Sequence, residues 1–214
     1  NQATELGELN TLKSKLFSVI SHDLKAPMYA LRNLFRNVHE NNMSADELKN
    51  SVPDVLNDLN YTVGLMDNLL QWAKAQMQAD AVHKQEVDIE QSVHEVMQLQ
   101  HLQAKSKQIS ITNNTKPGIL GYIDKDMLSL VLRNLISNSI KFTPENGTIA
   151  IGVYEHHSFI EVYVKDSGTG ISTDALLKIN SNDFYTTNGT ASESGTGLGL
   201  MLCKEFLARN GSHL

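Results

Sequence analysis

The first 79 residues contain two apolar stripes with helical spacing, and both need a partner to cover them. The first recurs at steps of three and four residues and consists of Phe17, Ile20, Leu24, Met28, Leu31, Phe35 and Val38. The second follows a capping-box pattern at Ser44 and Glu47 and consists of Val52, Leu56, Leu59, Val63, Met66, Leu70, Ala73 and Met77. One hairpin cannot bury both stripes, whereas two hairpins can in a four-helix bundle. The sequence therefore predicts that residues 1–79 form an α-helical hairpin within a homodimer.

Residues 80–214 have a mixed periodicity that differs from the first part. Helices are expected over 89–105, 127–142 and 197–210, and strands over 109–113, 119–123, 148–154 and 159–165. The stretch 180–194 is rich in Asn, Ser, Thr and Gly, which is typical of a mobile loop. Helices mixed with hairpin strands predict an α+β domain built as an α/β sandwich, joined to the hairpin by a linker near residues 78–84.

Composition indicates which classes of partner and which cellular compartment suit this chain. The net charge of −6 argues against nucleic acid as the main partner, because a phosphate backbone requires a basic face. The single cysteine, Cys203, cannot form an internal disulfide, which fits a reducing compartment. No apolar run approaches the roughly 20 residues that cross a bilayer, and no secretory signal opens the chain. We expect a cytoplasmic fragment, with any membrane anchor in segments outside this chain.

His22 is placed to act outside the bundle core. It lies two residues from both Ile20 and Leu24 of the stripe, so its side chain points about 160° away from them on a helix. Asp23 can hold one ring nitrogen and leave the other free to attack phosphorus. Pro27 interrupts the helical pattern and predicts a bend there. A lone helical histidine is more commonly a residue without a role, so its neighbours carry this hypothesis.

Three segments of the second part suit a nucleotide. Asn134, Asn138 and Lys141 share one helical face, where amide oxygens can ligate Mg²⁺ and an ammonium can meet phosphate. Asp166, Gly168 and Gly170 follow a predicted strand, and the carboxylate can accept a hydrogen bond from an exocyclic amine. Gly195, Gly197 and Gly199 precede the last helix, whose N-terminus favours anions. Each segment alone could be a solvated face or a turn.

These motifs together resemble a bacterial sensor histidine kinase core. The run from Phe17 to Pro27 is similar to the phosphoacceptor box of that family, and the three segments are similar to the N, G1 and G2 boxes of the Bergerat ATP-binding fold. Histidine kinases, gyrase-type ATPases and Hsp90 share this fold. The resemblance implies a dimerisation and phosphoacceptor domain over 1–79 and an ATP-binding catalytic domain over 80–214. It also implies a response-regulator receiver domain as the partner.

The resemblance assigns roles to individual residues. It implies that His22 is the phosphoacceptor and that Asp23 is its base or orienting partner. Asn138 would hold Mg²⁺, Asp166 would read the adenine amino group of ATP, and the remaining members would contact phosphates or shape the pocket. Those remaining members are Asn134, Lys141, Gly168, Gly170, Gly195, Gly197 and Gly199.

The sequence departs from the family pattern at several positions. Ala26 stands where the phosphatase motif usually has Thr or Asn, and Ser139 replaces the usual alanine. Phe184 and Tyr185 match the F box only loosely. The family domain usually continues with a strand hairpin, so we expect the C-terminal strands to be missing and the stability to be reduced. The histidines lack a spacing typical of metal ligands, and Cys203 is interpreted as a small core residue.

Two rival functions remain open at this point. One is a different ATP-driven machine of the same nucleotide fold, similar to gyrase or a chaperone. The other is a dimeric scaffold that binds nucleotide only as a signal. The phosphoacceptor box counts against the first, and the complete set of motifs counts against the second.

Overall fold

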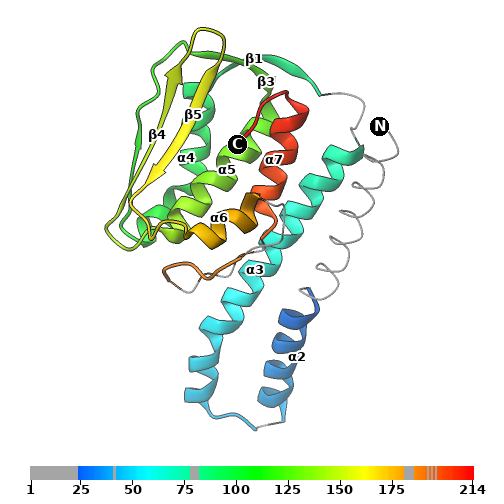
Figure 1. The fold of residues 1–214 in the computed structure, drawn as a ribbon. Coiled ribbons are helices and arrows are strands. Elements are labelled where there is room, and N and C mark those ends of the chain that lie inside the picture. The colour runs from blue at the N-terminus through cyan, green and yellow to red at the C-terminus, as the bar shows by residue number, and fades with distance from the viewer. Residues whose placement is uncertain are drawn as a thin grey trace. The chain divides into compact units, whose positions relative to one another are not determined.

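The computed structural model describes residues 24–40, 42–77, 82–180, 186–191, 193, 195 and 197–214. His22 and Asp23 lie outside the described residues, so the predictions about them stay predictions. A bend at Pro27 would involve the preceding turn, part of which also lies outside the described residues, so the bend stays a prediction as well. The chain divides into two compact units, Asn1–Leu70 and Gln71–Leu214. Figure 1 shows the elements of both units, and each unit is described by itself.

The first unit contains helix α2 (Lys25–His39) and the greater part of helix α3 (Ala45–Met77). The predicted capping box starts α3. The Ser44 backbone N–H and hydroxyl each donate to Glu47 Oε2 at 2.8 Å, and the Glu47 N–H donates back to Ser44 Oγ at 3.3 Å. Apolar side chains of both helices are exposed in the single chain: Met28, Phe35 and Val38 on α2, and Val52, Leu56, Val63, Met66 and Leu70 on α3.

The second unit has two small sheets. Strand β1 (Lys84–Asp88) pairs antiparallel with β3 (Leu120–Asp124). The other sheet has the order β2-β4-β5 and consists of β2 (Ser110–Asn113), β4 (Thr148–Glu155) and β5 (Ile160–Asp166). Strand β2 runs parallel to β4, which forms an antiparallel hairpin with β5. Asp166 pairs with Ile149 at the last position of this hairpin, so the sheet places it beside the following turn.

Besides the end of α3, the described residues of this unit form helices α4 (Ile89–Ser106), α5 (Lys125–Phe142), α6 (Thr173–Asn180) and α7 (Gly199–Arg209). Figure 1 shows α4 and α5 side by side next to the sheet, with α7 on the other side of α5. The main core fills the space between sheet and helices, where Leu132, Ile136 and Ile149 are almost fully buried. Leu202, Cys203 and Phe206 of α7 are buried as well. Helix α5 thus forms the centre of the domain, which has the predicted α/β character.

Two elements were not predicted from the sequence. Strand β1 begins at the end of the expected linker, and the sequence did not predict it because only Val87 of its five residues is buried and no apolar alternation marks it. Helix α6 is only eight residues long; it buries Ala175 and leaves Leu176 and Leu177 exposed. The predicted helices and strands from α4 to α7 are otherwise present, with boundaries shifted by one or two residues.

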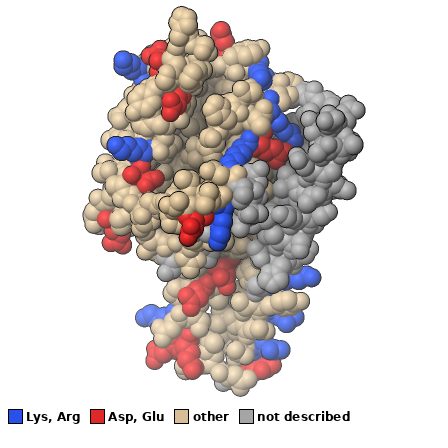
Figure 2. All heavy atoms as spheres, in the orientation of Figure 1, with Lys and Arg blue, Asp and Glu red and all other residues tan. Residues whose placement is uncertain are grey.

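The surface in view carries charges of both signs. Figure 2 shows Lys and Arg side chains interspersed with Asp and Glu on this face. Helices long and apolar enough to traverse a bilayer do not occur in the described part of the chain.

Candidate functional site

Helix α5 is the platform of the candidate site, and its start is rigidly defined. The Asp124 carboxylate caps it by accepting the N–H groups of Asp126 and Met127, both at 3.1 Å. The buried Asn210 side chain accepts the Asp124 N–H at 2.9 Å, which ties α5 to the end of α7. The predicted residues Asn134, Asn138 and Lys141 lie on this helix, and none of the three is fully buried.

Asn134 lies against the first residue of α7. Its side-chain N–H donates to Leu130 O at 3.0 Å, one turn back in the same helix. A β-carbon at Gly199 would lie 2.6 Å from Asn134 Oδ1, closer than real β-carbons approach. Glycine thus lets the start of α7 lie against Asn134 without displacing its side-chain amide. The structure brings together two residues that the sequence assigned to separate motifs.

Lys141 lies against the glycine-rich segment that precedes α7. Its ammonium donates to Thr187 O at 2.8 Å and lies 4.8 Å from the ring centroid of Phe142. A β-carbon at Gly195 would collide with the same ammonium. Burial lowers the pKa of Lys141, and the Glu193 carboxylate nearby offsets part of this effect. The ammonium is therefore a half-exposed cation at the point where the G2 segment meets α5.

Asp166 is exposed and is oriented from two sides. Its carboxylate accepts the Ser139 hydroxyl at 3.2 Å and the Gly168 N–H at 2.9 Å. A carboxylate has about four acceptor positions, so these two bonds leave capacity for an amine of a ligand. Ser139, which stands where the family usually has alanine, is buried on α5. Its hydroxyl connects α5 to the Asp166 carboxylate, which is predicted to bind adenine. The sequence did not predict this hydrogen bond.

The remaining predicted residues complete the surroundings. Gly170 and Gly197 have φ values of +72° and +67°, a backbone region that favours glycine. Asn138 has no side-chain hydrogen bond to any residue that the structure describes, which leaves its amide free for a ligand. Phe184 and Tyr185 lie outside the described residues.

A preformed metal site of acidic, histidine or cysteine ligands is not part of this arrangement. Within the described ranges, no three His, Cys, Asp or Glu residues come together in a way that could hold a metal ion. Mg²⁺ commonly takes one or two protein oxygens and fills its other positions with phosphate oxygens and water. The side-chain amide of Asn138 could supply one such protein oxygen, which fits a metal that is bound together with a nucleotide.

Comparisons with known proteins agree with this geometry. Residues 123–214 match the family described as histidine kinase-, DNA gyrase B-, and HSP90-like ATPase. The match includes α5, Asp166 and all five glycines of the candidate site. The second unit therefore has the ATP-binding α/β fold of this ATPase class.

The matches to whole chains are more specific. Sensor protein KdpD of Clostridium acetobutylicum is 30% identical over 212 residues, which is 97% of this chain and 23% of KdpD. Sensor protein SrrB of Staphylococcus aureus is 29% identical over 210 residues, 96% of this chain and 36% of SrrB. This chain thus spans less than two fifths of the length of these curated relatives.

A solved structure shows the same fold. It is histidine kinase ThkA, crystallised in complex with response regulator protein TrrA, and its TM-score to this chain is 0.72 at 20% identity. The aligned region is 99% of this chain and 58% of the matched chain of that structure. At this identity the ThkA likeness shows the fold alone. The sequence matches to sensor proteins KdpD and SrrB, with the match of residues 123–214 to the ATPase family, support a sensor histidine kinase core.

Proposed function

We propose that this chain uses ATP to phosphorylate its own His22 and then transfers the phosphoryl group to an aspartate of a response regulator. Residues 1–79 would be the dimerisation and phosphoacceptor domain and residues 80–214 the catalytic domain. The observation that carries the proposal is the meeting of three segments at α5. Asn134 lies against Gly199, Lys141 against Gly195, and Ser139 bonds Asp166.

The described side chains supply binding and charge neutralisation. Asp166 accepts a hydrogen bond from the adenine amino group, while Lys141 and Asn134 donate to phosphate oxygens. Asn138 holds Mg²⁺ through its amide oxygen. Bound ATP supplies the γ-phosphoryl group. Little covalent chemistry is left to the protein in such a transfer, so positioning provides most of the rate.

His22 is the nucleophile in this proposal. One ring nitrogen attacks the γ-phosphorus, the bond to the bridging oxygen breaks, and ADP leaves. Asp23 accepts the hydrogen bond of the other ring nitrogen and stabilises the charge that develops on the ring. The product is phosphohistidine, from which an aspartate of the receiver domain takes the phosphoryl group.

The proposed partners have separate support. ThkA is a histidine kinase that was crystallised with a response regulator, which supports a receiver domain as the acceptor. The exposed apolar side chains of α2 and α3, such as Phe35 at 64% and Leu70 at 66%, support a homodimeric four-helix bundle that would cover them.

The test is incubation with ATP labelled at the γ-phosphate. We expect label on the wild-type protein that survives alkali and is lost in acid, no label on His22→Ala, and strongly reduced label on Asn138→Ala. His39→Ala is the matched control, because His39 is an exposed histidine of α2 outside the motif. Label that persists on His22→Ala contradicts the proposed acceptor.

The same experiment separates the two rivals. ATP hydrolysis without labelled protein would favour a gyrase-like or chaperone-like ATPase. Nucleotide binding without hydrolysis or label, even after a receiver domain is added, would favour a non-catalytic scaffold. Transfer of label from His22 to an added receiver domain is the result that our proposal requires.

A further inference from the structure

Lys107 is a buried cation that the nucleotide motifs do not include. It follows α4 and is its C-cap residue, and only 9% of its side chain is exposed. Its ammonium donates to Ile140 O at 2.8 Å and to Lys141 O at 3.1 Å. These carbonyls belong to the last turn of α5, where helix geometry provides no backbone partner. Lys107 therefore caps the end of α5 that carries Asn138 and Lys141.

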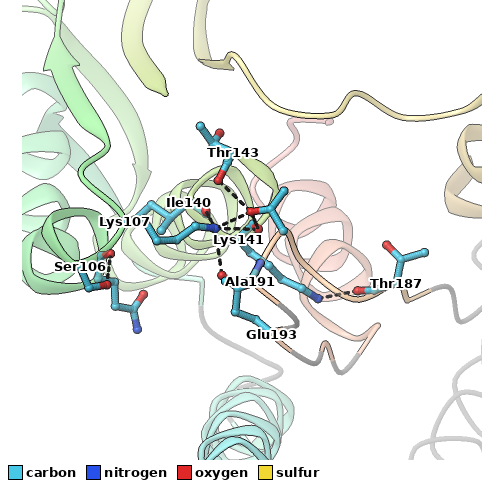
Figure 3. A network of polar contacts seen from close by, with 10 residues as sticks. Ser106, Lys107, Ile140, Lys141, Thr143, Thr187, Ala191 and Glu193 are labelled. Carbon is cyan, nitrogen blue, oxygen red and sulfur yellow. Dashed lines mark hydrogen bonds and ion pairs between the residues drawn. The ribbon is translucent and has the colours of Figure 1, made fainter. Parts of the chain in front are cut away.

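The same ammonium also reaches across to the segment before α7. It donates to Thr190 Oγ1 at 2.7 Å and forms an ion pair with Glu193 Oε1 at 3.0 Å. Figure 3 shows Lys107 reaching toward both α5 and this segment. A buried ammonium is stable only when it is paired and hydrogen-bonded. The position of Lys107 thus depends on partners from two parts of the chain at once.

The segment around Glu193 is built to receive this contact. Glu193 Oε2 accepts the Ala191 N–H at 2.8 Å, and its backbone carbonyl accepts the Gly189 N–H at 2.8 Å. The Thr190 N–H donates to Lys141 O at 3.0 Å. The Thr190 hydroxyl also donates to Lys141 O at 3.2 Å and to Thr143 O at 3.0 Å. Because Glu193 bonds the turn and Lys107 bonds Glu193, the ion pair adds a second connection between the turn and α5.

This connection reaches the proposed phosphate-binding lysine. Thr187, two residues before Gly189, accepts the hydrogen bond of the Lys141 ammonium. The position of Thr187 relative to Lys141 therefore depends on where the turn at 189–191 is held. A turn that is not anchored has to be ordered when a nucleotide binds, and this ordering reduces affinity.

We propose that Lys107 is a positioning residue of the ATP site: its ion pair with Glu193 anchors the turn at 189–191 to the end of α5. The inference rests on the proposed ATP-binding function, and it assigns to Lys107 and Glu193 a role that the nucleotide motifs do not contain.

Two variants separate anchoring from simple helix capping. Lys107→Met removes both the cap of α5 and the anchor. Glu193→Ala removes only the ion pair, because Lys107 keeps its carbonyl acceptors on α5 and its bond to Thr190 Oγ1. Lys105→Met is the matched control: it removes a positive charge two residues earlier, from an exposed side chain of the same helix. The whole 214-residue chain is used throughout.

The first measurement is hydrogen exchange of the Gly189 and Thr190 amides without nucleotide, with the Thr143 amide as the probe of the α5 end. Lys107→Met and Glu193→Ala should both accelerate exchange at Gly189 and Thr190 by about threefold to tenfold, the range that a partly buried ion pair supports. Glu193→Ala should leave Thr143 unchanged, and Lys105→Met should change none of the three amides. A purely structural role of Lys107 would leave Gly189 and Thr190 unchanged in Glu193→Ala, and this result would overturn the proposal.

The second measurement is the Kd of a non-hydrolysable ATP analogue by calorimetry. We expect it to rise about threefold to tenfold in both variants, with no further rise in the double variant, because the two residues act through one contact. Additive losses, or an unchanged Kd in Glu193→Ala, would overturn the positioning role. If the wild-type protein binds no ATP analogue, the proposed function fails and the role toward ATP fails with it, while the exchange data still decide whether Lys107 anchors the turn.

Discussion

Replacing Gly168 by alanine provides a quantitative test of the turn that positions Asp166. A β-carbon at this position would lie 2.7 Å from Phe142 O and 2.7 Å from Asp166 Oδ1, whereas ordinary contacts lie at 3.4–4 Å. The carboxylate can rotate away, but the carbonyl belongs to the backbone of α5 and cannot. The turn therefore has to move away from the helix, which also strains the hydrogen bond from Thr169 N to Phe142 O at 3.2 Å.

The cost follows from the size of this clash. Forcing one extra carbon into a packed site typically destabilises a protein by about 1–3 kcal/mol. For a domain of this size we expect a fall in melting temperature of about 3–10 °C. The displaced turn also moves the Asp166 carboxylate, so the affinity for an ATP analogue should fall as well.

Gly170→Ala is the matched control for this variant. Gly170 has a φ of +72° and no atom within 4 Å of an added β-carbon. Alanine there should cost about 1–2 kcal/mol through backbone strain alone, without a clash against α5. We therefore expect both variants to lose stability in calorimetric melts, but Gly168→Ala to lose more nucleotide affinity. A Gly168→Ala protein that melts within about 1 °C of the wild type would refute the argument, because the expected shift is several times larger.

Four further predictions concern individual side chains. Burial raises the pKa of Cys203 to about 12, so iodoacetamide at pH 8 should alkylate this thiol only after unfolding; rapid alkylation of the folded protein would contradict its burial. Burial alone would raise the pKa of Glu193, but hydrogen bonds from Lys107, from its own N–H and from Ala191, together with the Lys107 charge, lower it below its ordinary value. Ionised Glu193 therefore stabilises the fold at pH values above the ordinary pKa of a glutamate, and it loses this effect as the pH falls through the lowered pKa. Urea unfolding at pH 7 and pH 3 should thus show a smaller acid loss for Glu193→Gln than for the wild type. Ser139→Ala removes the bond to Asp166 and should weaken binding of an ATP analogue about twofold to tenfold in calorimetry, and an unchanged Kd would show that Ser139 does not orient the carboxylate. Phe35→Glu should convert the proposed dimer to monomer in light scattering without lowering helicity, and an unchanged mass would count against the bundle.

Local sequence signals predicted most elements because their physical causes are local. The capping box at Ser44 and Glu47 involves atoms three residues apart, and it starts α3 where the sequence predicts a helix. The apolar spacing of α5 predicted its buried side, and the polar residues opposite suggested a ligand face. The glycine segments predicted backbone suited to a ligand, and this stays a prediction; in the structure Gly199 and Gly168 also lie close to atoms of α5.

The sequence did not predict elements and pairings that depend on residues far apart in the chain. Strand β1 is a strand because β3, about 36 residues later, pairs with it from Lys84↔Asp124 onward. Helix α6 has only eight residues, which is a short window in which to recognise a helical repeat. The parallel pairing of β2 with β4 joins strands separated by all of β3 and α5, and no short window of sequence contains that information.

The sequence by itself determined the nucleotide-binding motifs, the helical stripes and the class of protein, because these depend on residue types at short, regular spacings. Only the tertiary structure decided which side chains support the motifs. Ser139 meets Asp166 across 27 residues, and Lys107 meets Glu193 across 86. Such contacts depend on how the helices and the sheet pack, because a hydrogen bond forms only where folding brings its two atoms within about 3 Å.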